Sequence, residues 1–194
     1  MKTRESGMPE EEMWAEFFTP EAILEKLGLT PGVRSLVDFG CGYGTFALAA
    51  ARIIAGKVQA IDIEPEMVAA TRNKAEAEGL DNVEAILRDF VGEGTDLTDQ
   101  SVDYVMLFNI LHAEDPDHLL KEAFRILRPG GLLAVIHWNF DPTTPRGPSM
   151  TIRPKPEQCR AWAEDAGFHL RSPGVIELPP YHYGLVFERP TEWS

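Results

Sequence analysis

Apolar runs of strand length alternate with amphipathic segments of helix length along most of this 194-residue chain. Strands covered on both faces read as continuous apolar runs, so this order is typical of a parallel sheet between two layers of helices. We predict a single α/β domain with a doubly wound sheet of seven strands. The predicted strands are residues 34–39, 57–63, 83–87, 102–109, 131–138, 169–177 and 183–188.

Proline and glycine mark the ends of the predicted helices. Proline is favoured in the first turn of a helix and glycine just after the last, so Pro65 and Gly79 delimit one helix clearly. The helices predicted between the strands are residues 45–55, 65–79 and 116–128. Residues 91–100 are too polar and too short to predict a helix. Residues 139–156 contain five prolines and predict a long loop.

The first 30 residues precede the sheet. Their apolar stripe consists of Met13, Trp14, Phe17 and Phe18. Thr19-Pro20-Glu21 follows and is interpreted as the capped start of a helix that ends at Gly28. We therefore divide the chain into an N-terminal helical segment, residues 1–30, and a domain of residues 31–194. The stripe is most simply a helix packed on the domain, and the sharper alternative is a lid over a bound ligand.

The formal net charge of −13 argues against nucleic acid as a partner, because binding to a phosphate backbone depends on clustered lysine and arginine. The nearest approach to a basic cluster is Arg146, Arg153, Lys155 and Arg160, interpreted as solvated surface or as a loop clamp for a small anion. No run approaches the roughly 20 apolar residues of a membrane helix, and no signal-peptide core is present. With only two cysteines, no disulfide framework is expected, and we predict a cytoplasmic protein.

A run of glycines between the first predicted strand and the next helix is the strongest functional signal. Gly40, Gly42 and Gly44 occupy a turn at the carboxyl end of a strand, which is where open parallel sheets bind ligands. Glycine allows a sharp bend with positive φ and lets a ligand touch the main chain. We predict a cofactor loop, since an acidic residue also ends the following strand.

That acid is Asp62, whose carboxylate can accept hydrogen bonds from both hydroxyls of a ribose, so we predict a nucleoside cofactor. Helix capping is the structural alternative for this residue. The dinucleotide fingerprint requires Gly or Ala where this chain has Thr45, which disfavours NAD. S-adenosylmethionine carries no phosphate and presents an ammonium group, for which Asp38 offers negative charge.

Over residues 33–138 the chain resembles the class I S-adenosylmethionine-dependent methyltransferases, of the small stand-alone bacterial and archaeal type. Motifs similar to five of this family occur in order at residues 37–45, 60–67, 88–90, 102–109 and 127–131. The resemblance implies a Rossmann-like domain with an antiparallel last strand, entered through a turn at Leu178-Pro179-Pro180. The chain departs from the commoner pattern in its meagre helix after the third strand and its lack of an inserted cap domain. The N-terminal segment and the proline-rich loop are then the candidates to cover a substrate.

The resemblance also implies cofactor-binding residues: Gly40, Cys41, Gly42, Asp62, Ile63, Asp89, Phe90 and Asn109. The glycine turn adds Gly44 to the predicted cofactor-binding residues, and the charge argument adds Asp38. Ile63 would cover one face of the adenine, and Asp89, with Phe90 beside it, would reach the exocyclic amine. Asn109 would line the methionine end. The structural alternatives are core positions for Ile63 and Phe90 and a turn for Asp89.

Substrate-side residues are expected at the ends of the fourth and fifth strands. Much of the rate of methyl transfer comes from holding the nucleophile in line with the methyl carbon, and a base helps where the acceptor is a hydroxyl. His112 and His137 are the predicted catalytic residues, with a merely structural role as the alternative. Alternation along a strand places His137 and Trp138 on opposite sides. The residues predicted to contact substrate are Trp14, Phe18, Trp138 and Tyr181.

We predict that the chain transfers a methyl group from S-adenosylmethionine to a small-molecule acceptor and releases S-adenosylhomocysteine, with O, N, S and C acceptors all open. The rival hypotheses are a nucleotide-dependent oxidoreductase and a non-catalytic protein that binds S-adenosylmethionine. The histidines and cysteines show no metal-ligand spacing, so no metal site is predicted.

Overall fold

The computed structural model describes residues 17–191. Their sheet has the order β3–β2–β1–β4–β5–β8–β6, with β7 paired to β8. The strands are β1 Ser35–Phe39, β2 Lys57–Asp62, β3 Val83–Leu87, β4 Val102–Phe108, β5 Leu127–Trp138, β6 His169–Leu170, β7 Ile176–Leu178 and β8 His182–Glu188. Strands β1 to β5 are parallel, and β8 is antiparallel to β5. The predicted mostly parallel sheet with an antiparallel last strand is confirmed.

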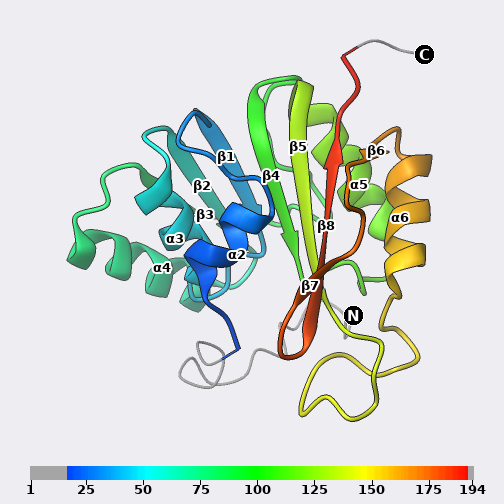
Figure 1. Cartoon of the computed structure of the whole chain (residues 1–194). Coiled ribbons are helices and arrows are strands. Elements are labelled where there is room, and N and C mark those ends of the chain that lie inside the picture. Colours follow the sequence, from blue (N-terminus) through cyan, green and yellow to red (C-terminus); the bar gives the residue numbers. More distant parts are fainter. Residues whose placement is uncertain (1–16, 192–194) are drawn as a thin grey trace.

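Helices cover both faces of this sheet, as Figure 1 shows. They are α2 Pro20–Lys26, α3 Thr45–Ile53, α4 Pro65–Glu78, α5 Pro116–Ile126 and α6 Pro156–Asp165. Helices α2, α3 and α4 lie on one face and α5 and α6 on the other. Neighbouring residues of one strand belong to different hydrophobic clusters: Leu36 packs on the side of α3, and Val37 on the side of α5. The core is therefore double, as a doubly wound fold requires.

Local signals set the helix ends as predicted. Pro65 begins α4, and the helix ends at Gly79, which has a left-handed φ of 67°. Asp115 caps α5 by accepting a hydrogen bond from the backbone N–H of His118, at 3.1 Å. Helix α2 begins at Pro20 as expected, but the Thr19 side chain makes no capping hydrogen bond. Residues 88–101 contain no helix, in agreement with the polar composition of that segment.

One helix was not predicted. Helix α6, Pro156–Asp165, begins where the proline-rich loop ends, and it buries Cys159 and Ala163, four residues apart, against the sheet. Its start, Pro156-Glu157, repeats the proline–acid pair that also begins α2, α4 and α5. The proline–acid signal for this helix is thus present in the sequence. It follows directly on a proline-rich segment, which by itself predicts only a loop.

The prediction of a single strand at residues 169–177 is wrong. This segment contains two short strands, β6 and β7, each antiparallel to a different part of β8. A turn with Gly174 at φ 94° separates them, so the sheet formed by residues 17–191 has eight strands rather than seven. The predicted turn at Leu178-Pro179-Pro180 is confirmed, since Leu178 pairs with His182 across it.

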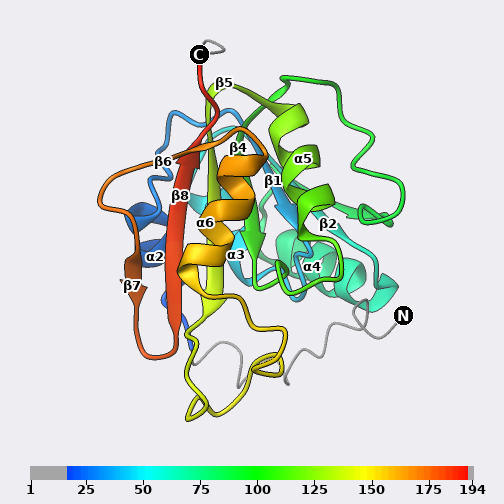
Figure 2. The ribbon, with the colours of Figure 1, turned by 90° about the vertical axis from the view of Figure 1, so that its right-hand side faces the viewer.

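The loop of residues 139–155 follows β5 and lies at the carboxyl end of the sheet, on the same side of the molecule as the β7–β8 turn (Figures 1 and 2). The glycine run after β1 and the segment after β4 end at this edge as well, because β1, β4 and β5 are parallel. Within residues 17–191, no helix is long and apolar enough to cross a membrane.

Candidate functional site

The turn from β1 to α3 has the backbone geometry that its glycines predicted. Gly40, Gly42 and Gly44 have φ values of 73°, 53° and 81°, in the left-handed region that favours glycine. A Cβ on Gly44 would lie 2.8 Å from Oγ1 of Thr71, so this position needs glycine for space as well as for its dihedral angle.

The Asp62 carboxylate ends β2 beside this turn. Its Oδ2 accepts a hydrogen bond from the backbone N–H of Gly42 at 2.8 Å, and its Oδ1 accepts one from the N–H of Glu64 at 3.0 Å. Burial raises the pKa of Asp62. Ile63 adds a further backbone hydrogen bond, and because a carboxylate has about four acceptor positions, room remains for a ligand's hydroxyl. Asp62 does not cap α4, whose N-cap is Glu64 without a side-chain capping hydrogen bond, and it lies beside the loop as ribose binding requires.

Asp38 lies buried in β1, with 3% of its surface exposed. Burial and the charge of Asp62 raise the pKa of Asp38 to about 8. The free protein at pH 7 therefore holds Asp38 largely protonated, and its negative charge develops fully only when a cation is nearby. A ligand's ammonium group would supply that cation.

Asn109 follows β4 with a positive φ of 57°. Its backbone N–H donates to the carbonyl of Ile136 at 2.7 Å. Both side-chain polar atoms are buried, and they have no hydrogen-bond partner among the described residues. Because buried amides are nearly always paired, this one fits a ligand with both donor and acceptor groups, such as the amino-acid end of S-adenosylmethionine.

The adenine-side candidates are half-buried or buried. Ile63 is only half-buried, which disfavours its alternative as a core residue. Phe90 is buried and packs on Phe39, with ring centroids 5.4 Å apart. Asp89 accepts a hydrogen bond from the N–H of Gly92 at 2.9 Å, so the turn proposed as its structural alternative is present. Cys41 is buried in the glycine turn, and burial raises the pKa of its thiol.

The two candidate catalytic histidines contact each other. His112 Nδ1 lies 3.4 Å from His137 Nε2. His137 is fully buried, and its Nδ1 accepts a hydrogen bond from the backbone N–H of Trp138 at 3.0 Å. Burial lowers the pKa of both imidazoles, so both rings are neutral at pH 7.

The substrate candidates on the other side of β5 form an aromatic group. Trp138 packs against Phe17 and His182, with ring centroids 5.6 and 4.2 Å apart, and stacks near Tyr181. Phe18 packs against His182 at 4.5 Å. His137 and Trp138 therefore face opposite sides of the sheet, as strand alternation predicted. Trp14 lies outside the described residues.

Arg153 does not serve as an anion clamp. Its guanidinium is buried and donates hydrogen bonds to five acceptors of the loop: the carbonyls of Asn139, Asp141, Arg146 and Pro148 and the hydroxyl of Thr144. Arg160, also in the sequence cluster, forms an ion pair with Glu164 on the outside of α6. Of the residues in the sequence cluster, Arg153 is thus buried and holds the loop together, while Arg160 is a surface residue.

Thr71 is a site residue that the sequence analysis missed. It is fully buried on α4, and its Oγ1 donates to the carbonyl of Gly42 at 2.9 Å. Val68, Thr71 and Ala75 form the buried stripe of α4, so a polar residue at an apolar position was the available signal. Thr71 thus anchors the glycine turn to α4.

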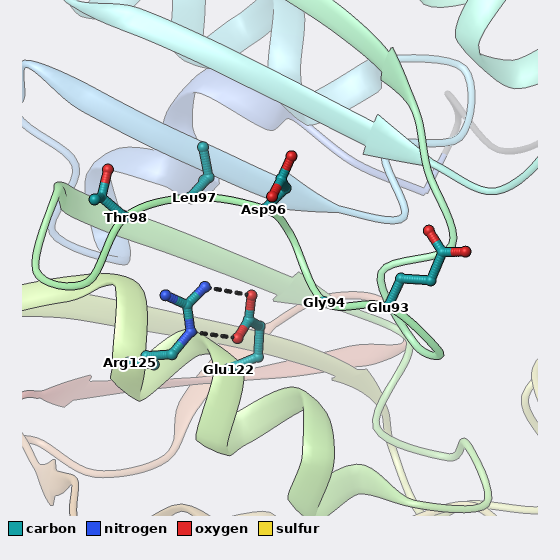
Figure 3. A pocket seen from close by; sticks show the side chains of 7 residues that line it. All are labelled: Glu93, Gly94, Asp96, Leu97, Thr98, Glu122 and Arg125. Carbon is teal, nitrogen blue, oxygen red and sulfur yellow. Dashed lines mark hydrogen bonds and ion pairs between the residues drawn. The ribbon is translucent and has the colours of Figure 1, made fainter.

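A separate pocket of about 500 Å³ opens between residues 93–98 and α5 (Figure 3). Glu122 accepts hydrogen bonds there from both the backbone N–H and the hydroxyl of Thr95, at 2.7 and 2.6 Å, and pairs with Arg125. None of its lining residues is a predicted site residue. These contacts attach the β3–β4 connection, which contains no helix, to α5. The polar residues that line the pocket therefore have a structural role. Among residues 17–191, no group of three metal-ligating side chains is present.

Comparisons with known proteins agree with this geometry. Residues 36–131 match the family described as methyltransferase domain. A "Probable S-adenosylmethionine-dependent methyltransferase" of Mycolicibacterium smegmatis is 30% identical over 195 residues, which cover 94% of this chain and 72% of that protein. The crystal structure of a SAM dependent methyltransferase from Aquifex aeolicus has a TM-score of 0.81 and 28% identity, and the match covers 97% of each chain.

An uncharacterized 37.1 kDa protein in transposon TN4556 of Streptomyces fradiae is 37% identical over 133 residues. That match covers 67% of this chain but only 37% of the other protein. The similarity to this longer relative is thus confined to a part of its length.

Proposed function

Because the chain belongs to the S-adenosylmethionine-dependent methyltransferases, we propose that it transfers the methyl group of S-adenosylmethionine to a small-molecule acceptor. The observation that carries the proposal is the hydrogen bond from the Gly42 N–H to Asp62, at 2.8 Å, because a carboxylate held beside the glycine turn supports ribose binding at this position. The cofactor supplies a sulfonium-activated methyl group when it is bound.

Residues of this chain fit the two ends of that cofactor. Asp62 and the half-buried Ile63 would hold the nucleoside. The Asn109 amide, which has no partner within residues 17–191, and the buried carboxyl of Asp38 would hold the methionine end. Asp38 and Asn109 belong to β1 and the end of β4, which are adjacent in the sheet. The two groups are therefore available at the same edge.

The acceptor would lie beyond the ends of β4 and β5, near His112 and His137. The loop of residues 139–155, fixed by Arg153, would cover it, together with Phe17, which packs on Trp138. The net charge of −13 favours a small molecule over nucleic acid. The rival oxidoreductase is disfavoured by Thr45 at the position of the third fingerprint glycine.

The proposal is tested with the variant Asp62→Ala. Losing the ribose contacts should weaken S-adenosylmethionine binding by roughly 10- to 100-fold in calorimetry, as expected for hydrogen bonds to a charged group. Glu66→Gln, which removes an exposed charge four residues away, is the matched control and should bind as the wild type does. Unchanged affinity in Asp62→Ala would contradict the ribose assignment.

Turnover is tested by a screen of small-molecule acceptors that detects S-adenosylhomocysteine, with NAD titrated in parallel. Release of S-adenosylhomocysteine with one acceptor, lost in Asp62→Ala, is the expected result. Tight NAD binding would favour the oxidoreductase. Cofactor binding with no turnover across the screen would favour the non-catalytic alternative.

A further inference from the structure

The hydrogen bond between the backbone of Trp138 and the side chain of His137 fixes where the His137 proton sits. The N–H of Trp138 can only donate, so Nδ1 of His137 must present its lone pair. Neutral imidazole carries one proton, and that proton is then on Nε2. His137 is fully buried, and it lies beside Tyr183 of β8.

The same argument extends to His112. Nε2 of His137, now an N–H donor, lies 3.4 Å from Nδ1 of His112. Nδ1 of His112 must therefore be the acceptor, and the single proton of this neutral ring lies on its own Nε2. His112 is only partly buried, in contrast to His137. The Nε2–H of His112 is therefore the group of this pair that a ligand can reach.

We propose that His137 is a positioning residue that holds His112 in its Nε2–H tautomer, so that His112 presents a hydrogen-bond donor, and not a base, to the methyl acceptor. The proposal rests on the proposed function for the identity of the ligand but not for the tautomers. It excludes the role of general base that the sequence suggested for His112, because the lone pair of His112 is directed at His137 rather than outward.

A donor at this place selects an acceptor that arrives without a proton to lose, and a carboxylate is the class that fits. One carboxylate lone pair accepts the hydrogen bond from His112, and another attacks. The carboxylate oxygen gains the bond to the methyl carbon while the carbon–sulfur bond breaks and its electron pair stays on sulfur. The products are a methyl ester and S-adenosylhomocysteine, and no proton is transferred.

The surroundings of the pair keep it neutral. The Tyr183 ring of β8 lies 6.4 Å from the His137 ring, and the positive charges that His182 and the loop residue Arg153 can carry both disfavour a charge on His137. Burial lowers the pKa of His182 as well, so it adds no charge at pH 7. Tyr183 donates its hydroxyl hydrogen to the carbonyl of Pro154 and is not a proton source for the pair.

The tautomers are measured directly by long-range ¹H–¹⁵N correlation of the imidazole nitrogens in uniformly ¹⁵N-labelled protein, without cofactor or acceptor. The expected result at pH 7 is an Nε2–H tautomer for both His137 and His112. The exposed His118 serves as an internal reference for a ring in water. A His112 ring protonated on Nδ1, or a charged one, would overturn the proposal.

Two variants separate positioning from packing. His137→Phe removes the donor and should release His112 into a mixture of tautomers. His137→Gln keeps an N–H near the Nε2 position and should restore the single Nε2–H tautomer of His112.

If an acceptor is found, carboxylic acids should lead the screen, and His137→Phe should raise KM for the acceptor at least several-fold more than it lowers kcat. An acceptor that requires deprotonation, with a rate controlled by a titrating His112, would contradict the donor role. Failure of methyl transfer altogether would leave the measured tautomers intact and so counts against the proposed function alone.

Discussion

At the scale of single residues, the raised pKa of Asp38 has a measurable consequence. Burial and Asp62 raise this pKa from 3.8 to about 8. The folded protein therefore keeps a proton that the unfolded chain releases, and the resulting stabilisation is complete below about pH 4 and lost as the pH rises through 8. We expect Asp38→Asn to stabilise the cofactor-free protein at pH 9 by about 1–3 kcal/mol. Denaturant unfolding at pH 5, 7 and 9 measures this, with the exposed Asp81→Asn as control.

The same carboxyl links cofactor binding to proton release. An ammonium group near Asp38 favours the ionised form, so binding of S-adenosylmethionine at pH 7 should release close to one proton, and none in Asp38→Asn. Calorimetry in buffers of different ionisation enthalpy counts the protons. Equal release by both proteins would show that Asp38 does not face the cofactor.

Gly44 and Thr71 form a second residue-scale test. Gly44→Ala combines a positive φ of 81° with a Cβ placed 2.8 Å from the Thr71 hydroxyl, and should cost about 2–4 kcal/mol of stability. Gly79→Ala is the matched control, because Gly79 has a similar φ of 67° and nothing within 4 Å of an added Cβ. It should show the dihedral strain alone, about 1–2 kcal/mol. Adding Thr71→Ala should recover part of the Gly44→Ala loss, and strict additivity in the double mutant would argue against the contact.

At the scale of elements, the loop of residues 139–155 is ordered from inside by one side chain. Arg153→Met removes hydrogen bonds to five loop acceptors and should destabilise the protein by roughly 2–3 kcal/mol. Limited proteolysis should then cut within the loop first. The exposed Arg146→Met is the control, since only the backbone carbonyl of Arg146 takes part. Equal protease resistance of both variants would mean that the prolines alone keep this loop ordered.

Element boundaries also show where sequence patterns succeed. Helices α4 and α5 were predicted from proline, glycine and capping residues, since these signals act within a few residues of themselves. The split of residues 169–177 into β6 and β7 was missed, because pairing with the two ends of β8 is decided by a distant strand. Helix α6 was missed although Pro156-Glu157 carries the local signal, since the adjoining prolines obscure it.

At the scale of the whole molecule, the sequence alone determined the α/β class, the glycine turn and the acid at the end of β2, because strand alternation and dihedral requirements are local. Only the tertiary structure decided what these residues can do. Burial between two helix layers makes Asp38 retain its proton, and the parallel pairing of β4 with β5 brings His112 to His137, 25 positions away in the sequence. Packing turns Arg153 from an apparent surface cation into the brace of a loop. Desolvation and long-range hydrogen bonds arise only when distant segments meet, so the residues that carry chemistry were predicted by type, while their charge, tautomer and partners depended on the fold.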